Sequence, residues 1–203
     1  MDADPIEIRV LGCLIEKQRT TPDVYPLSLN ALRAASNQTT NRDPVVAYDE
    51  QTIRAAIRRL DQRRWARLAS GPGSRAVKFR HLLDEALELS GPELAVLGVL
   101  MLRGPQTPGE LKGRTERMHP FASLAELHET LDGLIQRELV ARLPRRPGQK
   151  EERYAQLLGG EEADAARAET APSEPGAGVE ARLKRLEDEV ASLRQAVESL
   201  RAP

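Results

Sequence analysis

The stretch TIRAAIRRLDQRRWARLASGPGSRAVKF (residues 52–79) reads first as a helix and then as a β-hairpin. Its apolar residues recur at steps of four and three, and a Gly/Pro turn separates two short runs with strand character. The stretch ELHETLDGLIQRELVARLPRRPGQKEERY (residues 126–154) repeats this arrangement at an offset of 74, which rises to 75 after one insertion. A helix followed by a hairpin is the C-terminal half of a winged helix, so the sequence predicts two copies of that unit.

The segments upstream of the two copies also match each other. EIRVLGCLIEKQ (7–18) and ELAVLGVLMLRG (93–104) are both helical in period, and both carry Val-Leu-Gly at the centre. Each is followed by a Thr-Pro step and a short second helix, capped by Ser28 in the first copy and by Thr107 in the second. We therefore predict an α+β fold, mainly α with small β-hairpins, built from two tandem winged-helix domains. The predicted domains are residues 1–88 and 89–158.

The chain changes character after Leu158. Residues 159–178 lack apolar periodicity and are rich in Ala, Glu, Gly and Pro, which predicts a flexible linker. Residues 179–203 have valine at a and leucine at d positions, which favours a two-stranded parallel coiled coil and hence a homodimer. The alternative is a lone amphipathic helix that folds back onto the winged-helix body. The residues expected at the dimer seam are Leu183, Leu186, Val190, Leu193, Val197 and Leu200.

The composition limits the class of protein. The chain has 203 residues, of which 40% are hydrophobic, enough for one or two small cores. No stretch approaches the roughly 18 apolar residues of a membrane span, and the charged N-terminus does not resemble a signal peptide. We therefore expect a cytoplasmic protein without a membrane segment. Cys13, the single cysteine, falls in the apolar set of a predicted helix, and we expect it to be a small buried hydrophobe.

The formal net charge of −1 conceals a gradient along the chain. Residues 50–80 hold nine basic and two acidic residues, a local charge of +7. Residues 159–203 hold six basic and ten acidic residues, a local charge of −4. If the protein binds a polyanion, residues 50–80 are therefore the expected contact.

Three motifs in the first predicted domain resemble a known family. They are Leu-Gly-x-Leu-x-Glu-Lys (11–17), Thr-Pro-x-x-Tyr-Pro-Leu-Ser-Leu-Asn-Ala-Leu (21–32) and Asn-Gln-x-x-Asn-Arg-Asp-Pro-Val (37–45). Together they are similar to the YceH family, bacterial proteins of unassigned function with two winged-helix domains. The resemblance covers residues 5 to about 158. It implies the tandem fold and DNA-binding or regulatory behaviour, but no catalytic residue, ligand or target.

No constellation of residues predicts catalysis, a metal site or a cofactor. The three histidines, His81, His119 and His128, lie in different predicted segments, and no phosphate-binding Gly-Lys-Ser/Thr loop is present. His81 and His128 have carboxylates at helical spacing, but neither has the third ligand that a metal ion needs. We therefore expect a protein that is not an enzyme and holds no cofactor.

The third helix of the first domain is the expected contact with double-stranded DNA, since this helix enters the major groove in helix-turn-helix folds. Its apolar stripe faces inward, which leaves glutamine and arginine side chains free to pair with adenine and guanine. The wing and the loop before the helix would add contacts to phosphates or the minor groove. The alternative is that the arginines merely pair with Glu50 and Asp61. The expected DNA contacts are Gln51, Arg54, Arg58, Arg59, Arg75 and Arg42.

The second domain differs in the charge of its third helix. Glu126, Glu129 and Asp132 are expected on the exposed face, where they would repel phosphates. We expect this domain to pack on the first one or to bind a protein partner. An adapter whose winged helices bind proteins and not DNA is therefore the alternative function.

The segment SNQTTNRDP (36–44) joins the second and third helices of the first domain and is longer than the usual turn of three or four residues. Its amides and hydroxyls can cap the preceding helix. Alternatively, the segment lies beside the third helix and holds a phosphate or the backbone of a partner. Both roles stay open at this point. The residues concerned are Asn37, Gln38, Asn41 and Asp43.

Overall fold

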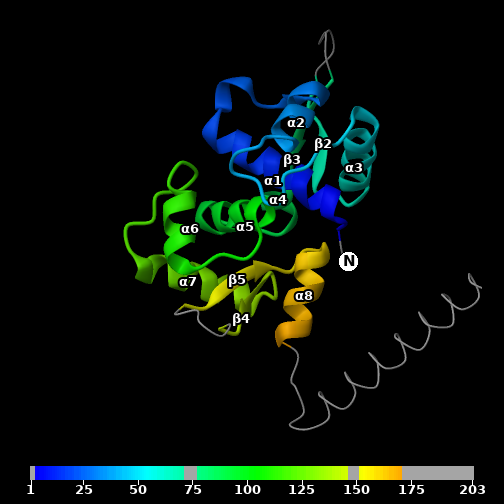
Figure 1. Cartoon of the computed structure of the whole chain (residues 1–203). Helices are drawn as coiled ribbons and strands as arrows, with labels where there is room; N and C mark the ends of the chain where they lie inside the picture. The colour runs from blue at the N-terminus through cyan, green and yellow to red at the C-terminus, as the bar shows by residue number, and fades with distance from the viewer. Residues whose placement is uncertain (1–2, 71–76, 146–150, 171–203) are drawn as a thin grey trace, which may run out of the picture. The chain divides into compact units, whose positions relative to one another are not determined.

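The computed structural model describes residues 3–70, 77–145 and 151–170 (Figure 1). Each half of this region contains three helices followed by an antiparallel hairpin. The predicted α+β class and the predicted order of elements are therefore confirmed. Among the described helices, none has both the length and the apolar character needed to cross a bilayer.

The first half begins with a helix that is buried almost all round. Its elements are α1 (Pro5–Thr20), η1 (Pro22–Val24), β1 (Leu27–Ser28), α2 (Leu29–Ser36), α3 (Glu50–Gln62), β2 (Ala66–Leu68), β3 (Lys78–His81) and α4 (Leu83–Ala86). The sheet order is β1-β3-β2, with Phe79 opposite both Leu27 and Leu68. The sequence did not predict the two-residue strand β1, because its pairing with β3 is a tertiary contact.

The second half repeats the arrangement and adds a helix at its end. Its elements are α5 (Gly91–Arg103), α6 (Pro108–Thr115), α7 (Leu124–Gln136), β4 (Val140–Leu143), β5 (Arg153–Gln156) and α8 (Glu161–Thr170). The two strands pair antiparallel, with Val140 opposite Gln156 and Leu143 opposite Arg153. The predicted helix caps are confirmed: Ser28 accepts from the N–H of Ala31, and Thr107 forms a capping box with Glu110.

Helix α8 corrects the prediction of a flexible linker over residues 159–178. It lies beside β4 and β5 (Figure 1) and buries Ala163 and Ala166, and the latter packs against Ala141 and Ala155 of the sheet. The segment offers only alanines to the sheet, so it shows no stripe of large apolar residues. The rest of the predicted linker and the predicted dimer seam, from Leu183 to Leu200, lie outside the described residues.

Helices α1 and α5 join the two halves, and the shared Val-Leu-Gly motif lies at their contact. A β-carbon on Gly12 would lie 3.0 Å from Leu102 and Met101 of α5, and one on Gly98 would lie 3.0 Å from Ile15 of α1. The glycines therefore let the two helices approach closely. As a result, the halves share one core and form a single compact unit, Met1–Thr170, and not two separate domains. Cys13 is fully buried in this core, as predicted, and burial raises the pKa of its thiol.

Ala3, which precedes α1, contacts the end of the second half. The N–H of Ala3 donates to the carbonyl of Leu158, and Ala3 forms a bridge with Gly159. Gly159 has a φ of 141°, and a β-carbon there would lie 2.2 Å from the carbonyl oxygen of Ala3. Only glycine fits this position. The contact between Gly159 and Ala3 holds the N-terminus of α1 near the hairpin and α8.

Candidate nucleic-acid interface and a basic cleft

Helix α3 has the orientation that the sequence predicts. The Asp49 carboxylate caps its N-terminus by accepting from the N–H of Thr52 at 2.7 Å. The side chains that face the core are Ile53, Ala56, Ile57 and Leu60. Gln51, Arg54 and Arg58 are exposed on the opposite side, as predicted. The helix therefore presents a polar face with an amide near its N-terminus and arginines along its length.

The arginines of α3 differ in their partners. Arg54 pairs with Glu50 at 2.6 Å across one turn of the helix, which is the pairing that the sequence left open. Both side chains are about half exposed, and such pairs contribute only about 0.3–0.5 kcal/mol. Arg58 forms no ion pair with any residue that the structure describes. Arg58 is therefore free to meet an external anion, and the Arg54 pair can open at little cost.

Arg59 corrects the predicted set of DNA contacts. Its guanidinium turns toward the N-terminus of α1, where it contacts Asp4 and lies 3.5 Å from Glu7. Arg63 also donates to Glu7 at 3.0 Å, and the Glu7 side chain is almost fully buried. The prediction placed Arg59 on the open face because a helical wheel does not show where the neighbouring helix ends. Arg59 and Arg63 therefore hold α3 against α1.

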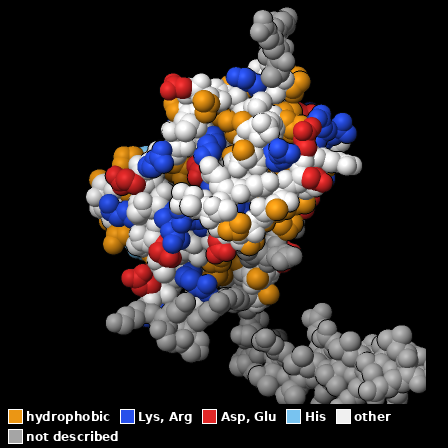
Figure 2. Space-filling model, turned by 45° about the horizontal axis from the view of Figure 1, so that its top comes forward, with side chains coloured by type: hydrophobic (Ala, Val, Ile, Leu, Met, Phe, Trp, Pro, Cys, Tyr) orange, Lys and Arg blue, Asp and Glu red, His pale blue; other side chains and the backbone are white. Residues whose placement is uncertain are grey.

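The hairpin adds cations next to α3. Arg67 and Lys78 carry no ion pair within the described part of the chain, whereas Arg80 pairs with Glu85 at 2.9 Å. Arg67 lies opposite Arg80 in the ladder. Figure 2 shows Lys and Arg side chains mixed with neutral and acidic ones over one face of the molecule. The predicted contact Arg75 lies outside the described residues.

Arg42 also corrects the prediction, because it is 6% exposed and fully engaged. Its two terminal nitrogens bind the Glu16 carboxylate at 3.1 and 2.7 Å. It also donates to the carbonyls of Ala35 and Asn41 and to the side chain of Gln38. Burial alone would raise the pKa of Glu16, but the hydrogen bonds and charge of Arg42 hold it below its ordinary value. Arg42 is therefore a structural residue that fixes the loop on α1.

The loop residues Asn37, Gln38, Asn41 and Asp43 are hydrogen-bonded within the folded chain, Asp43 through its main-chain N–H. The Asn37 side chain binds both the N–H and the carbonyl of Tyr48 at 2.8 Å, which closes the loop at its base. Arg103 of α5 donates to the side chain of Asn41, and the N–H of Asp43 donates to the carbonyl of Leu102 at 2.9 Å. The loop therefore reaches the second half, and its length is what lets it do so.

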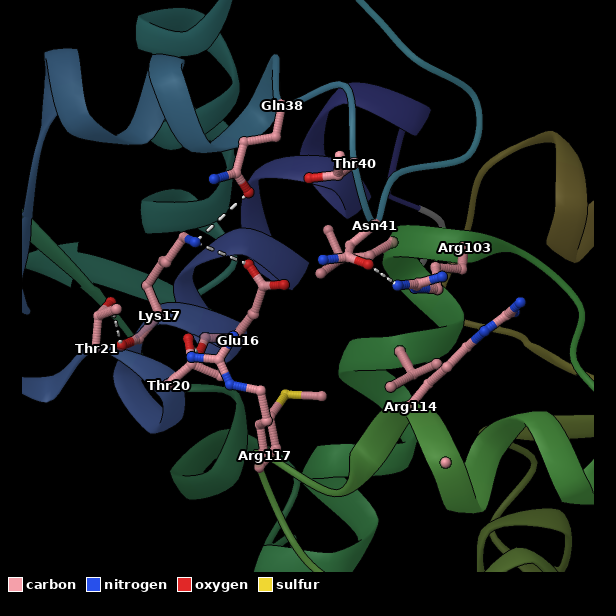
Figure 3. Close-up of a pocket in the computed structure, with 14 residues that line it drawn as sticks. Glu16, Lys17, Thr20, Thr21, Gln38, Thr40, Asn41, Arg103, Arg114 and Arg117 are labelled. Atoms are coloured by element: carbon pink, nitrogen blue, oxygen red, sulfur yellow. Dashed lines mark hydrogen bonds and ion pairs between the residues drawn. The ribbon is translucent and has the colours of Figure 1, made fainter.

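A basic cleft lies between this loop and the second half (Figure 3). We define the basic cleft as two adjoining hollows of about 470 and 690 Å³ that share Asn41, Arg103 and Arg114. The cations along it are Lys17 of α1, Arg103 of α5, Arg114 of α6, Arg117 after α6, and Arg153 of β5. The sequence did not point to these residues, because each is an ordinary surface cation in its own segment and only packing brings them together.

His81 and His119 each contact side chains of their own surroundings. His81 is buried, with Nε2 2.7 Å from the Gln18 amide oxygen and Nδ1 3.4 Å from Asp84. Burial is the main reason that its pKa falls to about 4, and the charges of Arg19 and Arg80 lower it further. His119 stacks edge-on against Phe121, far along the chain from His81. Within the described residues, no group of three or more His, Cys, Asp or Glu side chains could hold a metal ion.

Helix α7, the counterpart of α3, presents carboxylates. Glu129 and Asp132 are exposed, together with His128, as the sequence predicts. Asp132 lies 3.4 Å from Arg142 of the hairpin. The face of α7 therefore offers little attraction to a polyanion.

Comparison with known proteins places this chain among bacterial proteins of similar length. The family described as "Protein of unknown function, DUF480" matches residues 3–149. A UPF0502 protein of Pelobacter propionicus is 52% identical over 201 residues, which cover 96% of this chain and 91% of the relative. A UPF0502 protein of Geobacter sulfurreducens is 50% identical over 93% of this chain and 88% of its own length. One from Mesorhizobium japonicum is 47% identical over 97% and 95%.

Proposed function

The chain belongs to the DUF480 family, the same family that the three sequence motifs indicate, and we propose that it is a non-enzymatic, DNA-binding transcriptional regulator. The observation that carries the proposal is the exposed surface formed by α3 and the β2–β3 hairpin. This surface presents the amide of Gln51 and three cations that form no ion pair with any described residue, Arg58, Arg67 and Lys78. The contact is with double-stranded DNA, through the first half only.

Each group on this surface has a chemical role in the proposed contact. Gln51 lies in the first turn of α3, at the end of the helix that meets base edges in helix-turn-helix proteins. Arg58 lies two turns further on and would pair with guanine or with a phosphate. Arg54 would leave Glu50 for the DNA at little cost, since the pair is exposed. Arg67 and Lys78 of the hairpin would neutralise phosphates and contribute affinity without sequence preference.

The predicted dimer belongs to the same proposal. A homodimer through the seam from Leu183 to Leu200 would present two α3 helices to a two-fold symmetric site. The way to test it is to compare the full chain with one that ends at Thr170. A chain cut at Leu158 would lose α8 and expose the sheet that α8 covers. Loss of dimers without loss of the folded body is the expected result for the chain that ends at Thr170.

A salt titration tests DNA binding directly. The measurement is the fluorescence anisotropy of a labelled mixed-sequence duplex, titrated with the full chain at two salt concentrations. Affinity should fall steeply with salt, and Arg67→Gln should lower the slope of log K against log salt by about one. The matched control is Arg142→Gln, which changes the equivalent position in the other hairpin and should leave the slope unchanged. No binding at low salt would contradict the proposal.

An adapter that binds proteins is the second candidate, because apolar side chains are exposed on the first hairpin. Leu68 and Val77 are 54% and 53% exposed. Exposed apolar patches of this kind often mark protein contacts. Under this alternative the charged face of α3 is an ordinary solvated surface, and the salt titration would show no binding by the unmodified chain.

A further inference from the structure

The basic cleft gathers cations from both halves of the molecule around one concave space. Lys17 and Arg117 line one end, and Arg103, Arg114 and Arg153 line the other. In the view of Figure 3, Arg117 extends toward Glu16 and Thr20, whereas Arg114 points the opposite way. The cleft therefore has two positively charged ends with the Asn41 side chain between them.

The carboxylates in the cleft are fewer than its cations. Glu16 is held by Arg42 in a bidentate pair and also lies 3.4 Å from Lys17, and Glu110 caps α6 and lies 3.2 Å from Arg114. Arg117 forms no ion pair with any residue that the structure describes. Among the described residues, the Arg103 side chain donates to the neutral amide oxygen of Asn41. The lining holds six cations, Arg42 included, and three carboxylates, Glu16, Asp43 and Glu110, so the positive charge of the cleft is only partly balanced.

The electrostatics of Arg103 agree with this charge imbalance. Burial lowers the pKa of Arg103, and repulsion from Arg114 and Arg42 lowers it further. Like charges that crowd in a partly desolvated space raise the free energy of the empty site. Bound anionic oxygens would relieve that repulsion.

The far end of the cleft contains hydrogen-bond donors without acceptors. Two guanidinium nitrogens of Arg153, Nε and Nη2, are buried and have no hydrogen-bond partner among the described residues. These two N–H groups form the edge of the guanidinium that binds carboxylates and phosphates in bidentate fashion.

The size and lining of the cleft indicate the kind of ligand. Val99, Leu102 and Met118 add an apolar wall, and Thr20, Thr21 and Gln38 add neutral polar groups. A hollow of about 470 Å³ has the dimensions of a small-molecule site, and a DNA duplex cannot enter it. We propose that the basic cleft binds a small organic polyanion whose phosphate or carboxylate groups contact Lys17 and Arg117 at one end and Arg103 and Arg114 at the other. This site does not depend on the DNA-binding proposal.

The test is calorimetric titration of the full chain at constant ionic strength with three probes. Inorganic pyrophosphate supplies phosphate charge alone, citrate supplies carboxylates, and adenosine diphosphate adds an organic group to phosphate. At least one probe should bind saturably, and its identity separates phosphate from carboxylate ligands. Arg103→Gln and Arg117→Gln should each weaken that binding about tenfold, as expected for the loss of a charged hydrogen bond. Saturable binding of none of the three probes would overturn the proposal.

Two controls separate the site from general charge effects. Arg142→Gln removes the same charge outside the cleft and should leave the affinity for the probe unchanged; an equal loss in this variant would overturn the assignment. Arg117→Gln loses no ion pair of the described residues, so its thermal unfolding midpoint should match that of the unmodified chain. If Arg117→Gln weakens duplex binding and Arg67→Gln does not, the cleft belongs to a nucleic-acid surface, and the small-molecule assignment is wrong.

Discussion

Helices α3 and α7 occupy the same place in the two halves and differ almost only on their exposed faces. Both are 13 residues long, and both bury an aliphatic stripe at the same spacing. Arg58 of α3 corresponds to Asp132 of α7 at the offset of 74. Burial requires apolar residues at the stripe and places little constraint on the exposed side. The stripe therefore maintains the fold, and the exposed face is where the two halves could acquire different roles.

The loops before these helices differ as much as the helices do. Residues 37–49 separate α2 from α3, whereas residues 116–123 separate α6 from α7. The longer loop is held on α1 by Arg42 and reaches α5 through Asn41 and Asp43. The first half thus carries both the basic helix and the segment that joins the halves. Four predictions test this asymmetry.

Removal of Arg42 should have the largest effect. Arg42→Met removes the bidentate partner of the mostly buried Glu16 carboxylate, which keeps only Lys17 at 3.4 Å, and should lower the free energy of unfolding by about 3–5 kcal/mol. Arg142→Met, in the exposed pair of the other half, should cost less than about 1 kcal/mol. Urea denaturation of both variants measures the difference, and equal losses would refute the structural role of Arg42.

The Arg42 pair also predicts a dependence on pH. The pKa of Glu16 in the folded protein is below the ordinary value of 4.5, so its contribution is fully present above pH 4.5. That contribution is lost as the pH falls through the folded-state pKa, because the unfolded chain binds the proton more readily. In Arg42→Met the loss over this range should be smaller than in the unmodified chain.

The second prediction concerns His81, which is buried in the first half. Its pKa is lowered to about 4 in the fold, against 6.5 for the free side chain, so the unfolded chain binds the proton between these values. The contribution of neutral His81 to the free energy of unfolding should therefore be fully present above pH 6.5. The free energy of unfolding should fall by about 3 kcal/mol as the pH drops from 6.5 to 4. Urea denaturation of His81→Gln should show a weaker slope over this range. His128→Gln, on the exposed face of α7, is the matched control and should keep the slope.

The third prediction concerns the contact between the halves. Gly12→Val places atoms against Leu102 and Met101, where a β-carbon alone would already be at 3.0 Å, and should destabilise the protein by about 1–3 kcal/mol. Gly133→Val of α7 meets no atom within 4 Å of the added β-carbon and should be close to neutral. Denaturation that is monitored with two different probes should show one transition for the unmodified chain. Two separate transitions would mean that the halves are independent after all.

The smallest effect is expected from exchange of the charges on the two helices. Arg58→Asp and Asp132→Arg are both exposed changes and should alter the free energy of unfolding by no more than about 0.5 kcal/mol. Arg58→Asp should nevertheless weaken duplex binding, whereas Asp132→Arg should not. Anisotropy titrations at one salt concentration distinguish the two. Equal affinities in both variants would contradict a contact made by α3 alone.

Much of the fold could be predicted because its signals are local. Apolar spacing, N-caps and Gly/Pro turns each depend on residues within a few positions of one another, and they identified the helix–hairpin repeat in both halves. Arg58 and Gln51 were also predicted correctly as exposed, because burial of Ile53 and Ile57 fixes the opposite face of the same helix.

Other residues were predicted wrongly or missed because their environment comes from distant segments. Arg42 and Arg59 have the same side chain as Arg58, but Glu16, Asp4 and Glu7 lie next to them only in the folded chain. The sequence predicts a linker where α8 forms, because the alanines of this helix bury little area and depend on the sheet for stability.

The sequence by itself determined the α+β class, the repeat, the order of elements and the family, because periodicity, caps and motifs depend on residues that are close together in the sequence. Only the tertiary structure decided that Gly12 and Gly98 serve the contact between α1 and α5, and that Lys17, Arg103 and Arg117 surround one cleft. Those facts depend on distances between residues far apart in the chain, which are set by the packing of two helices and not by any local preference.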